Sequence, residues 1–265
     1  MPFTVSHIAA VLPLNKRLAK YTALSPLVIG SMTPDVGYWT PFLVNQRMET
    51  HSLIGLYLFC IPMGLTIYFL YHLLMAPVIV SFLPRNIQRH LNPNLFIGKL
   101  PPTPAHVLLI SLILGAITHI VWDFFTHQSG IPQYITWFEI PLMTIDGYDV
   151  KSYRVLQHLS SILGLGLLAY WILRWYKRKR LIKNYANYWQ APKELKTIAI
   201  ALIGLVTLLG AAFNAFMYQP ETDVLYGIYS AQIYLRHAVV GAMGSFMLAC
   251  LGAGVLYQVR IKAKK

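Results

Sequence analysis

Apolar residues form five long stretches along the chain, separated by shorter polar segments. A helix that crosses a membrane needs about 20 mostly apolar residues. Five stretches meet this requirement: Ser52–Phe82, Ala105–Thr126, Val155–Tyr176, Thr197–Tyr218 and Ala231–Gln258. We therefore predict an all-α fold, a polytopic membrane helical bundle with about five transmembrane helices. The first stretch is overlong and contains Pro62 and Pro77, so we expect it to kink or to end near Met75.

The first fifty residues follow a less regular pattern. Phe3–Leu14 and Leu24–Met32 are apolar but short, and prolines interrupt this part of the chain. They can form a re-entrant helix pair, an interfacial helix or a true span, and we favour short helices that pack on the bundle without spanning. The chain is then a single integral membrane domain, residues 1–265. Residues 1–50 form its N-terminal helices, 51–160 the core with the site motifs, and 161–265 the remaining helices.

Composition and charge support this interpretation. The 265 residues are 56% hydrophobic and only 12% charged, whereas soluble domains carry about 25% charged residues. The net charge of +13 comes from basic residues that cluster beside the apolar stretches. There they set topology and contact anionic lipid headgroups, so we expect membrane lipids as partners and no nucleic acid.

The basic clusters also predict an orientation. Arg174–Lys183 ends the third stretch, Arg260–Lys265 ends the fifth, and Arg85, Arg89 and Lys99 lie between the first two. Five spans place all three regions on one side, which predicts a cytoplasmic C-terminus. Lys16, Arg17 and Lys20 would then lie outside. If residues 24–44 span the membrane instead, these three move inside and the N-terminus reverses.

The second stretch carries the most unusual polar residues. His119, Asp123 and His127 follow one another at intervals of four, so they share one face of a helix. Ionisable groups in a membrane-spanning helix are costly and usually mark a site. Other polar residues converge on the same predicted membrane face: His7, Asp35, His51, Asp146, Asp149, His158 and His237. Imidazoles and carboxylates together suit Zn²⁺, Mn²⁺ or iron, and two metals bridged by a carboxylate would also fit.

Simpler explanations exist for several of these residues. His158 and His237 at helix ends can simply contact water or lipid phosphate, Asp146 can start a turn in Ile145-Asp-Gly147, and Asp35 can cap a helix. The His119/Asp123/His127 face can be a polar seam that joins helices through hydrogen bonds. A structural or assembly protein would use the cluster only in that way. A proton or divalent-cation transporter would need polar residues through the whole membrane, and the inner halves of the second, third and fourth spans are nearly free of them.

Several short motifs resemble a known family. They are Met1-Pro-Phe-Thr-Val-Ser-His7, Leu27-Val-Ile-Gly-Ser-Met-Thr-Pro-Asp35, Thr50-His-Ser52, Thr118-His119, Trp122-Asp123 and Thr126-His127. Together they resemble the bacterial membrane domain-of-unknown-function family 4184. That family is similar to predicted membrane-bound metal-dependent hydrolases, which share an early histidine, a Pro-Asp, a His-Ser and a later His-x-x-x-Asp. The resemblance implies that His7, Asp35, His51, His119 and Asp123 bind metal, with His127 as a further candidate, and that the protein lies in the bacterial inner membrane.

The residues and the resemblance lead to one functional hypothesis. We expect a membrane metal-dependent hydrolase with a divalent metal, Zn or Mn, at the outer membrane face. His119, Asp123, His51 and Asp35 would be ligands, while His7 and His127 would be ligands or outer-shell residues. Asp146 or Glu49 would act as general base. A site at headgroup depth suits a lipid or lipid-linked phosphoester as substrate.

Overall fold

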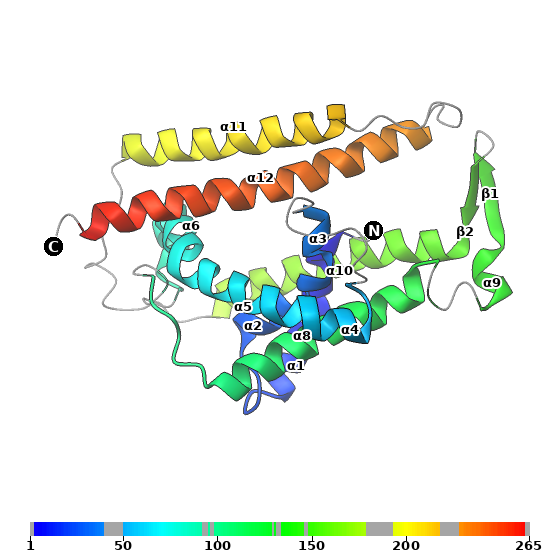
Figure 1. The fold of residues 1–265 in the computed structure, drawn as a ribbon, viewed down its shortest axis with the longest axis horizontal. Coiled ribbons are helices and arrows are strands. Elements are labelled where there is room, and N and C mark those ends of the chain that lie inside the picture. Colours follow the sequence, from blue (N-terminus) through cyan, green and yellow to red (C-terminus); the bar gives the residue numbers. More distant parts are fainter. Residues whose placement is uncertain are drawn as a thin grey trace. The chain divides into compact units, whose positions relative to one another are not determined.

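The computed structural model describes residues 3–39, 50–91, 95, 98–128, 130, 134–145, 148–178, 193–217 and 228–262. These residues are almost entirely helical (Figure 1), which confirms the predicted fold class. Five helices are long and apolar enough to cross a membrane: Leu53–Phe82, Ala105–Thr126, Ser152–Arg178, Glu194–Met217 and Ile233–Val259. Their bounds lie within a few residues of the five predicted stretches. The protein therefore has the helices of an integral membrane protein.

Short helices form the N-terminal region, as predicted. They are the 3₁₀ helix η1 (Thr4–His7), α1 (Ile8–Arg17), α2 (Leu24–Gly30), the 3₁₀ turn η2 (Thr33–Asp35) and α3 (Val36–Trp39). With ten residues at most, each is too short to cross a bilayer. The described residues therefore support the non-spanning alternative over a true span before residue 40.

The first span continues to Phe82, so the possible end near Met75 is not observed. It consists of α4 (Leu53–Gly55), η3 (Leu56–Cys60), α5 (Ile61–Leu70), η4 (Tyr71–Met75) and α6 (Ala76–Phe82). Both η3 and η4 are π-helical turns. Proline lacks an N–H and clashes with the carbonyl four residues earlier. For Pro62 and Pro77 that carbonyl belongs to Leu58 and Leu73, each inside a π turn, so the wider turn accommodates the proline within a continuous helix.

The remaining elements complete the chain. They are α7 (Arg85–Gln88), α8 (Ala105–Thr126), α9 (Thr136–Glu139), β1 (Pro141–Ile145), β2 (Tyr148–Lys151), α10 (Ser152–Arg178), α11 (Lys193–Met217) and α12 (Ile228–Lys262). The antiparallel pair β1–β2 is absent from the sequence prediction. Lys151 on β2 forms an ion pair with Glu139 on α9, which ties the short helix to the hairpin.

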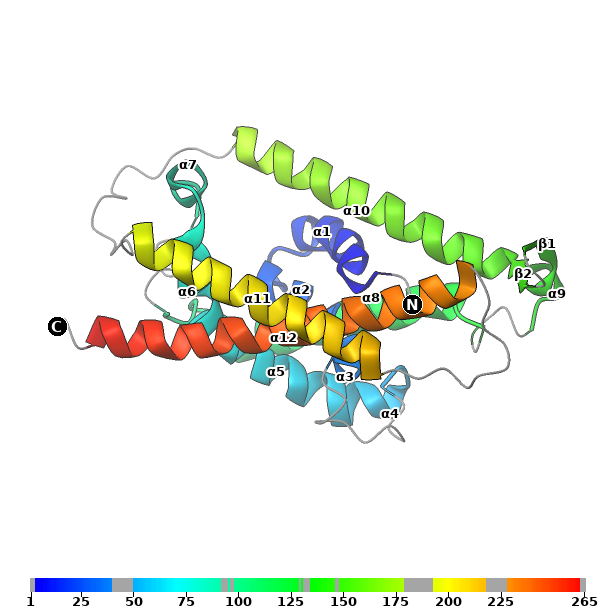
Figure 2. The same ribbon diagram turned by 90° about the horizontal axis from the view of Figure 1, so that it is seen from above.

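The chain divides into two compact units. Unit 1 contains Met1–Tyr68 and Thr103–Trp175, and unit 2 contains Phe69–Pro102 and Tyr176–Lys265. In unit 2, α11 and α12 pack side by side (Figure 1 and Figure 2). Small residues allow this approach: a Cβ added to Gly241 would lie 2.3 Å from the carbonyl oxygen of Gly210. Asn214 on α11 donates a hydrogen bond to the His237 carbonyl on α12, at 2.7 Å.

Unit 1 is built around α2 and α8, which cross at two glycines. A Cβ on Gly30 would lie 2.3 Å from the Leu112 carbonyl oxygen, and one on Gly115 would lie 2.3 Å from that of Leu27. Only glycine permits such close backbone contact between helices. His119 lies one turn beyond Gly115, and Ser31 follows Gly30. The crossing therefore brings the polar end of α8 against the backbone that leads to Asp35.

Candidate metal centre

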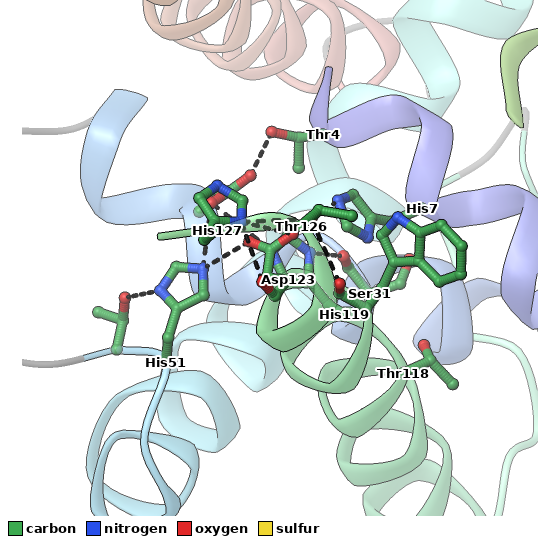
Figure 3. Close-up of polar contacts among 12 residues, drawn as sticks. Thr4, His7, Ser31, His51, Thr118, His119, Asp123, Thr126 and His127 are labelled. Atoms are coloured by element: carbon green, nitrogen blue, oxygen red, sulfur yellow. Dashed lines mark hydrogen bonds and ion pairs between the residues drawn. The ribbon is translucent and has the colours of Figure 1, made fainter. Parts of the chain in front are cut away.

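Four side chains from three segments meet at the end of α8. His119 and Asp123 come from α8, Asp35 from η2, and His51 from the residues just before α4. The side chains of His51, His119 and Asp123 point toward one another (Figure 3). One ligand atom of each of the four residues lies within 4.8 Å of all the others. His119, Asp35 and Asp123 are buried, while the His51 side chain is 30% exposed. His51 therefore forms the accessible edge of the cluster.

The spacing of the ligand atoms is the most informative feature of the cluster. His119 Nε2 lies 3.3 Å from Asp123 Oδ2 and 3.6 Å from Asp35 Oδ1. His51 Nε2 lies 3.3 Å from Asp123 Oδ2 and 3.4 Å from Asp35 Oδ1. Charge-assisted hydrogen bonds between nitrogen and oxygen are about 2.7–2.9 Å long. Four ligands at about 2.0–2.2 Å around one tetrahedral Zn²⁺ are instead about 3.3–3.6 Å apart. These four nitrogen–oxygen distances fit shared ligation of one cation.

The other nitrogen of each histidine is held by a neighbour. His119 Nδ1 lies 2.7 Å from the Ser31 carbonyl oxygen, which can only accept, so Nδ1 carries the proton. Nε2 therefore points at the carboxylates, and it would bind a cation there as an unprotonated nitrogen. His51 Nδ1 lies 3.0 Å from the Thr50 hydroxyl, and its Nε2 faces the same carboxylates. Metal-binding histidines show this arrangement, in which an outer partner fixes the tautomer and the ring orientation.

Burial and charge also favour a cation at this place. Within the described residues, every ion pair of Asp35 and Asp123 is with a histidine, so lysine and arginine take no part in balancing the two carboxylates. Buried carboxylates without compensation are costly. Moreover, Nε2 of His119 is buried and makes no hydrogen bond. One divalent cation would neutralise both carboxylates and would be coordinated by this nitrogen. The residues present therefore fit a metal ion.

The surroundings shift the pKa values of the groups that lie outside the spans. Burial alone would raise the pKa of the Asp35 carboxyl, but its contacts with His119 and His51 outweigh burial and hold the pKa well below its ordinary value. Burial alone would lower the pKa of His51, but the carboxylates of Asp123 and Asp35 outweigh it and raise the pKa. The hydroxyl of Thr4 donates a further hydrogen bond to Asp35 Oδ2. These shifts reflect a negative site that attracts positive charge.

His7 lies beside the cluster rather than inside it. Its ring stacks on that of His119, with ring centroids 3.9 Å apart and an angle of 16° between the planes. His7 Nε2 is buried, makes no hydrogen bond and lies 3.5 Å from Asp123 Oδ1. Burial, followed by the neighbouring His119, lowers the pKa of His7 to about 4. His7 is therefore neutral at pH 7, with an unused polar atom next to the cluster.

His127 closes the end of α8 on the other side of Asp123. Its Nδ1 lies 3.2 Å from the Asp123 carbonyl oxygen and 3.5 Å from Asp123 Oδ1. Its Nε2 lies 3.0 Å from the side-chain nitrogen of Gln157 on α10. Burial lowers the pKa of His127. The Nε2 atom of His127 thus contacts a side-chain amide, whereas Nε2 of His51 and of His119 faces the two carboxylates.

Sequence reasoning named six candidate metal ligands, and the structure brings all six together: His7, Asp35, His51, His119, Asp123 and His127. Their roles as ligands stay predictions. The candidate bases Glu49 and Asp146 lie outside the described residues, and His158 is exposed on α10. Nothing in the sequence pattern marks Gln157, the residue beside His158, as part of the site. The motif around Ser31 and Thr4 was recognised, but not the contacts of these two residues.

Comparison of the sequence with known protein families gives a match. A family model described as "Domain of unknown function (DUF4184)" matches residues 1–255, which is nearly the whole chain. No curated protein matches, and neither does any solved structure.

Proposed function

The chain belongs to this family of unknown function, and we propose that it is a membrane metalloprotein that binds one divalent cation, Zn²⁺ or Mn²⁺, and hydrolyses a phosphoester. The ligands in this proposal are Asp35, His51, His119 and Asp123. The observation that carries it is the spacing of 3.3–3.6 Å between their nitrogen and oxygen atoms. A polar seam built from hydrogen bonds would have shorter contacts.

The cation would supply one kind of chemistry, since a bound divalent metal lowers the pKa of water and polarises a phosphoryl oxygen. The chain's own residues prepare the site. The Ser31 carbonyl and the Thr50 hydroxyl orient the two imidazoles. Thr4 holds one oxygen of Asp35, so that the other oxygen faces the histidines. His51, which is 30% exposed, lies where a substrate would approach.

The proposed substrate is a lipid or lipid-linked phosphoester at the membrane face. His51 immediately precedes the first span, and the next exposed residues on that span are Leu53 and Ile54, at 76% and 72% exposure. A polar group bound at His51 would therefore lie beside a surface suited to acyl chains. We also propose that this face is the outer face of a bacterial inner membrane. The reason is that basic residues cluster at Arg174–Lys183 and Arg260–Lys265, after the third and fifth spans, and such clusters favour the cytoplasmic side.

Metal content provides the first test. Protein purified in detergent without chelator should hold about one equivalent of Zn²⁺ or Mn²⁺, or take it up on addition. His119→Ala and Asp123→Ala should lose most of it, since loss of a direct ligand costs more than the 10–100-fold change typical of an outer-shell residue. His106→Ala is the matched control, because His106 is exposed near the start of the same helix. Wild-type protein that binds neither metal would overturn the metal site.

Hydrolysis provides the second readout on the same variants. A short-chain phospholipid in mixed micelles should be cleaved with metal present, and cleavage should vanish in Asp123→Ala but persist in His106→Ala. Metal binding without hydrolysis of lipid or soluble phosphodiesters would reject the enzymatic part and keep the metal site. Metal flux into vesicles under those conditions would support transport instead.

A further inference from the structure

Gln157 is the one buried polar side chain of α10 that reaches the edge of the cluster. It is 6% exposed, and its amide nitrogen lies 3.0 Å from His127 Nε2. The opposite ring nitrogen of His127, Nδ1, faces the Asp123 carbonyl at 3.2 Å, the Thr126 hydroxyl at 3.4 Å and Asp123 Oδ1 at 3.5 Å. The Thr126 hydroxyl donates its own hydrogen to the Trp122 carbonyl at 3.3 Å, so its oxygen can act as an acceptor toward Nδ1. Gln157, His127 and Asp123 thus form a chain of contacts from α10 to a proposed metal ligand.

The chemistry of these groups selects one arrangement of protons. A neutral imidazole has one N–H and one lone pair, and an amide –NH₂ can only donate. The amide of Gln157 therefore donates to the lone pair at His127 Nε2, and the ring proton lies on Nδ1. There it points at the Asp123 carbonyl oxygen and lies beside Oδ1. The opposite tautomer would place a lone pair against two oxygens and an N–H against the amide –NH₂.

We infer that Gln157 is a positioning residue that selects the Nδ1–H tautomer of His127 and so holds Asp123 in place. The Asp123 carbonyl already accepts the backbone N–H of His127 at 2.9 Å, and the ring N–H provides a second donor at this oxygen. Both bonds close the last turn of α8. They leave Asp123 Oδ2 directed at His119 and His51. This inference rests on the proposed metal site, which Asp123 serves through Oδ2.

The position of α10 makes Gln157 a fixed support. Ser161, one turn later, donates a hydrogen bond to the Gln157 carbonyl at 2.9 Å and accepts one from the Phe3 backbone N–H at 3.2 Å. Beyond it, a Cβ on Gly164 would lie 2.9 Å from the side chain and from the backbone oxygen of Ser6. The helix that carries Gln157 is therefore packed against the segment that carries His7.

A double-mutant cycle tests whether Gln157 acts through His127. Gln157→Met keeps the size of the side chain and removes the amide donor, so Zn²⁺ affinity measured against a competing chelator should fall about 10–100-fold. Asparagine at position 127 carries an amide N–H near the place of Nδ1–H, and this donor does not depend on residue 157. In the His127→Asn background, Gln157→Met should therefore change affinity less than about twofold. Equal losses in both backgrounds would mean a general structural role and would overturn the inference.

Ser160→Ala is the matched control. Ser160 also lies on α10 and also contacts α8, through the Trp122 Nε1–H at 3.4 Å. Its hydroxyl donates to the backbone carbonyl of Gln157 at 3.0 Å, so Ser160→Ala tests the local helix without removing the side-chain amide. This substitution should leave Zn²⁺ affinity unchanged. A loss of Zn²⁺ affinity as large as that of Gln157→Met would show that any weakening of the α8–α10 contact has the same effect. That result would contradict a specific role for Gln157.

The tautomer can be measured without metal. Histidine-selective ¹⁵N labelling distinguishes protonated from unprotonated ring nitrogens, and the resonances missing in His127→Asn assign the ring. Wild-type protein should show Nδ1–H and unprotonated Nε2, and Gln157→Met should lose this preference. Nε2–H in the wild-type protein would overturn the inference. If the protein binds no metal but His127 keeps Nδ1–H, the proposed function fails while the selection by Gln157 stands.

Discussion

Helices α8 and α11 are equally apolar but have opposite surroundings. Both helices are long and apolar enough to cross a membrane, so hydrophobicity does not distinguish them. One face of α8 is buried, whereas no described side chain of α11 is buried. The buried stripe of α8 runs from Leu108 through Gly115 to Asp123. Hydropathy thus indicates that a helix can insert into a membrane. Burial indicates which helix packs against the other segments of its unit.

Both units contain a helix pair in close contact at glycines, but the residues that follow the glycines differ. Gly30 and Gly115 allow α2 and α8 to touch in unit 1, as Gly210 and Gly241 allow α11 and α12 to touch in unit 2. Past the glycines, α8 carries His119 and Asp123, both buried. The α11–α12 contact continues with Asn214, a neutral side chain. Small residues therefore explain close packing in both units, and in unit 1 the contact leads on to the buried His119 and Asp123.

The largest expected difference lies in two leucines on these helices. Leu112 on α8 is 1% exposed and packs with Tyr68 and Leu108, whereas Leu208 on α11 is 70% exposed. Leu112→Ala leaves a cavity and should lower the free energy of unfolding by about 2–5 kcal/mol. Leu208→Ala should change it little, because lipid surrounds this side chain in folded and unfolded states alike. Unfolding in mixed micelles with increasing dodecyl sulfate measures both. Equal losses would mean that α11 has a protein partner on that face.

Metal removal should affect unit 1 alone. With free Zn²⁺ at about 100 times its Kd, binding adds about 2.7 kcal/mol to the stability of the folded state. Chelation should therefore speed amide hydrogen exchange in Thr4–His7, Thr33–Asp35 and the last turn of α8, and leave α11 and α12 unchanged. Asp123→Ala should not respond to chelator. A response spread evenly over both units would contradict the assignment of the metal to unit 1.

The smallest effect is expected at Asn214. Its side-chain hydrogen bond to the His237 carbonyl joins α11 to α12 inside the membrane. Such bonds contribute about 0.6 kcal/mol on average, so Asn214→Ala should lower the free energy of unfolding by about that amount. Metal content should stay at the wild-type value. Loss of metal in this variant would show that unit 2 supports the site and would weaken the contrast between the units.

Much of the fold was predictable because the lipid bilayer restricts which secondary structures can cross it. Backbone groups in lipid must bond within the chain, so long apolar stretches become helices. The interval of four in His119, Asp123 and His127 fixes a shared face whatever the rest of the chain does. The hairpin β1–β2 was missed, because its strands are short and lie outside the apolar stretches. The π turns were missed as well, because composition reveals a proline but not how the preceding turn adapts.

The partners of the site residues were harder to predict. Gln157 and His158 are adjacent, and only the phase of α10 decides that Gln157 is buried and His158 exposed. Ser31 contributes its backbone carbonyl, which every residue has, so its sequence gives no sign of the role. Thr4 reaches Asp35 across 31 positions of chain, a contact set by how the N-terminal helices pack. Such pairings depend on tertiary geometry that a single sequence does not encode in its local pattern.

The division of unit 1 into two stretches of sequence has a consequence for the order of events during synthesis. Asp35 and His51 leave the ribosome well before His119 and Asp123, and residues 69–102, which belong to unit 2, are made in between. Asp35 and His51 are therefore synthesised before the residues of α8 that they contact, and Gln157 is synthesised after α8. A chain that stops before α8 lacks half of the proposed ligands. The protein could therefore bind metal at this site only after residue 123 has been synthesised and inserted into the membrane. Metal binding would then mark a late stage in the assembly of the protein.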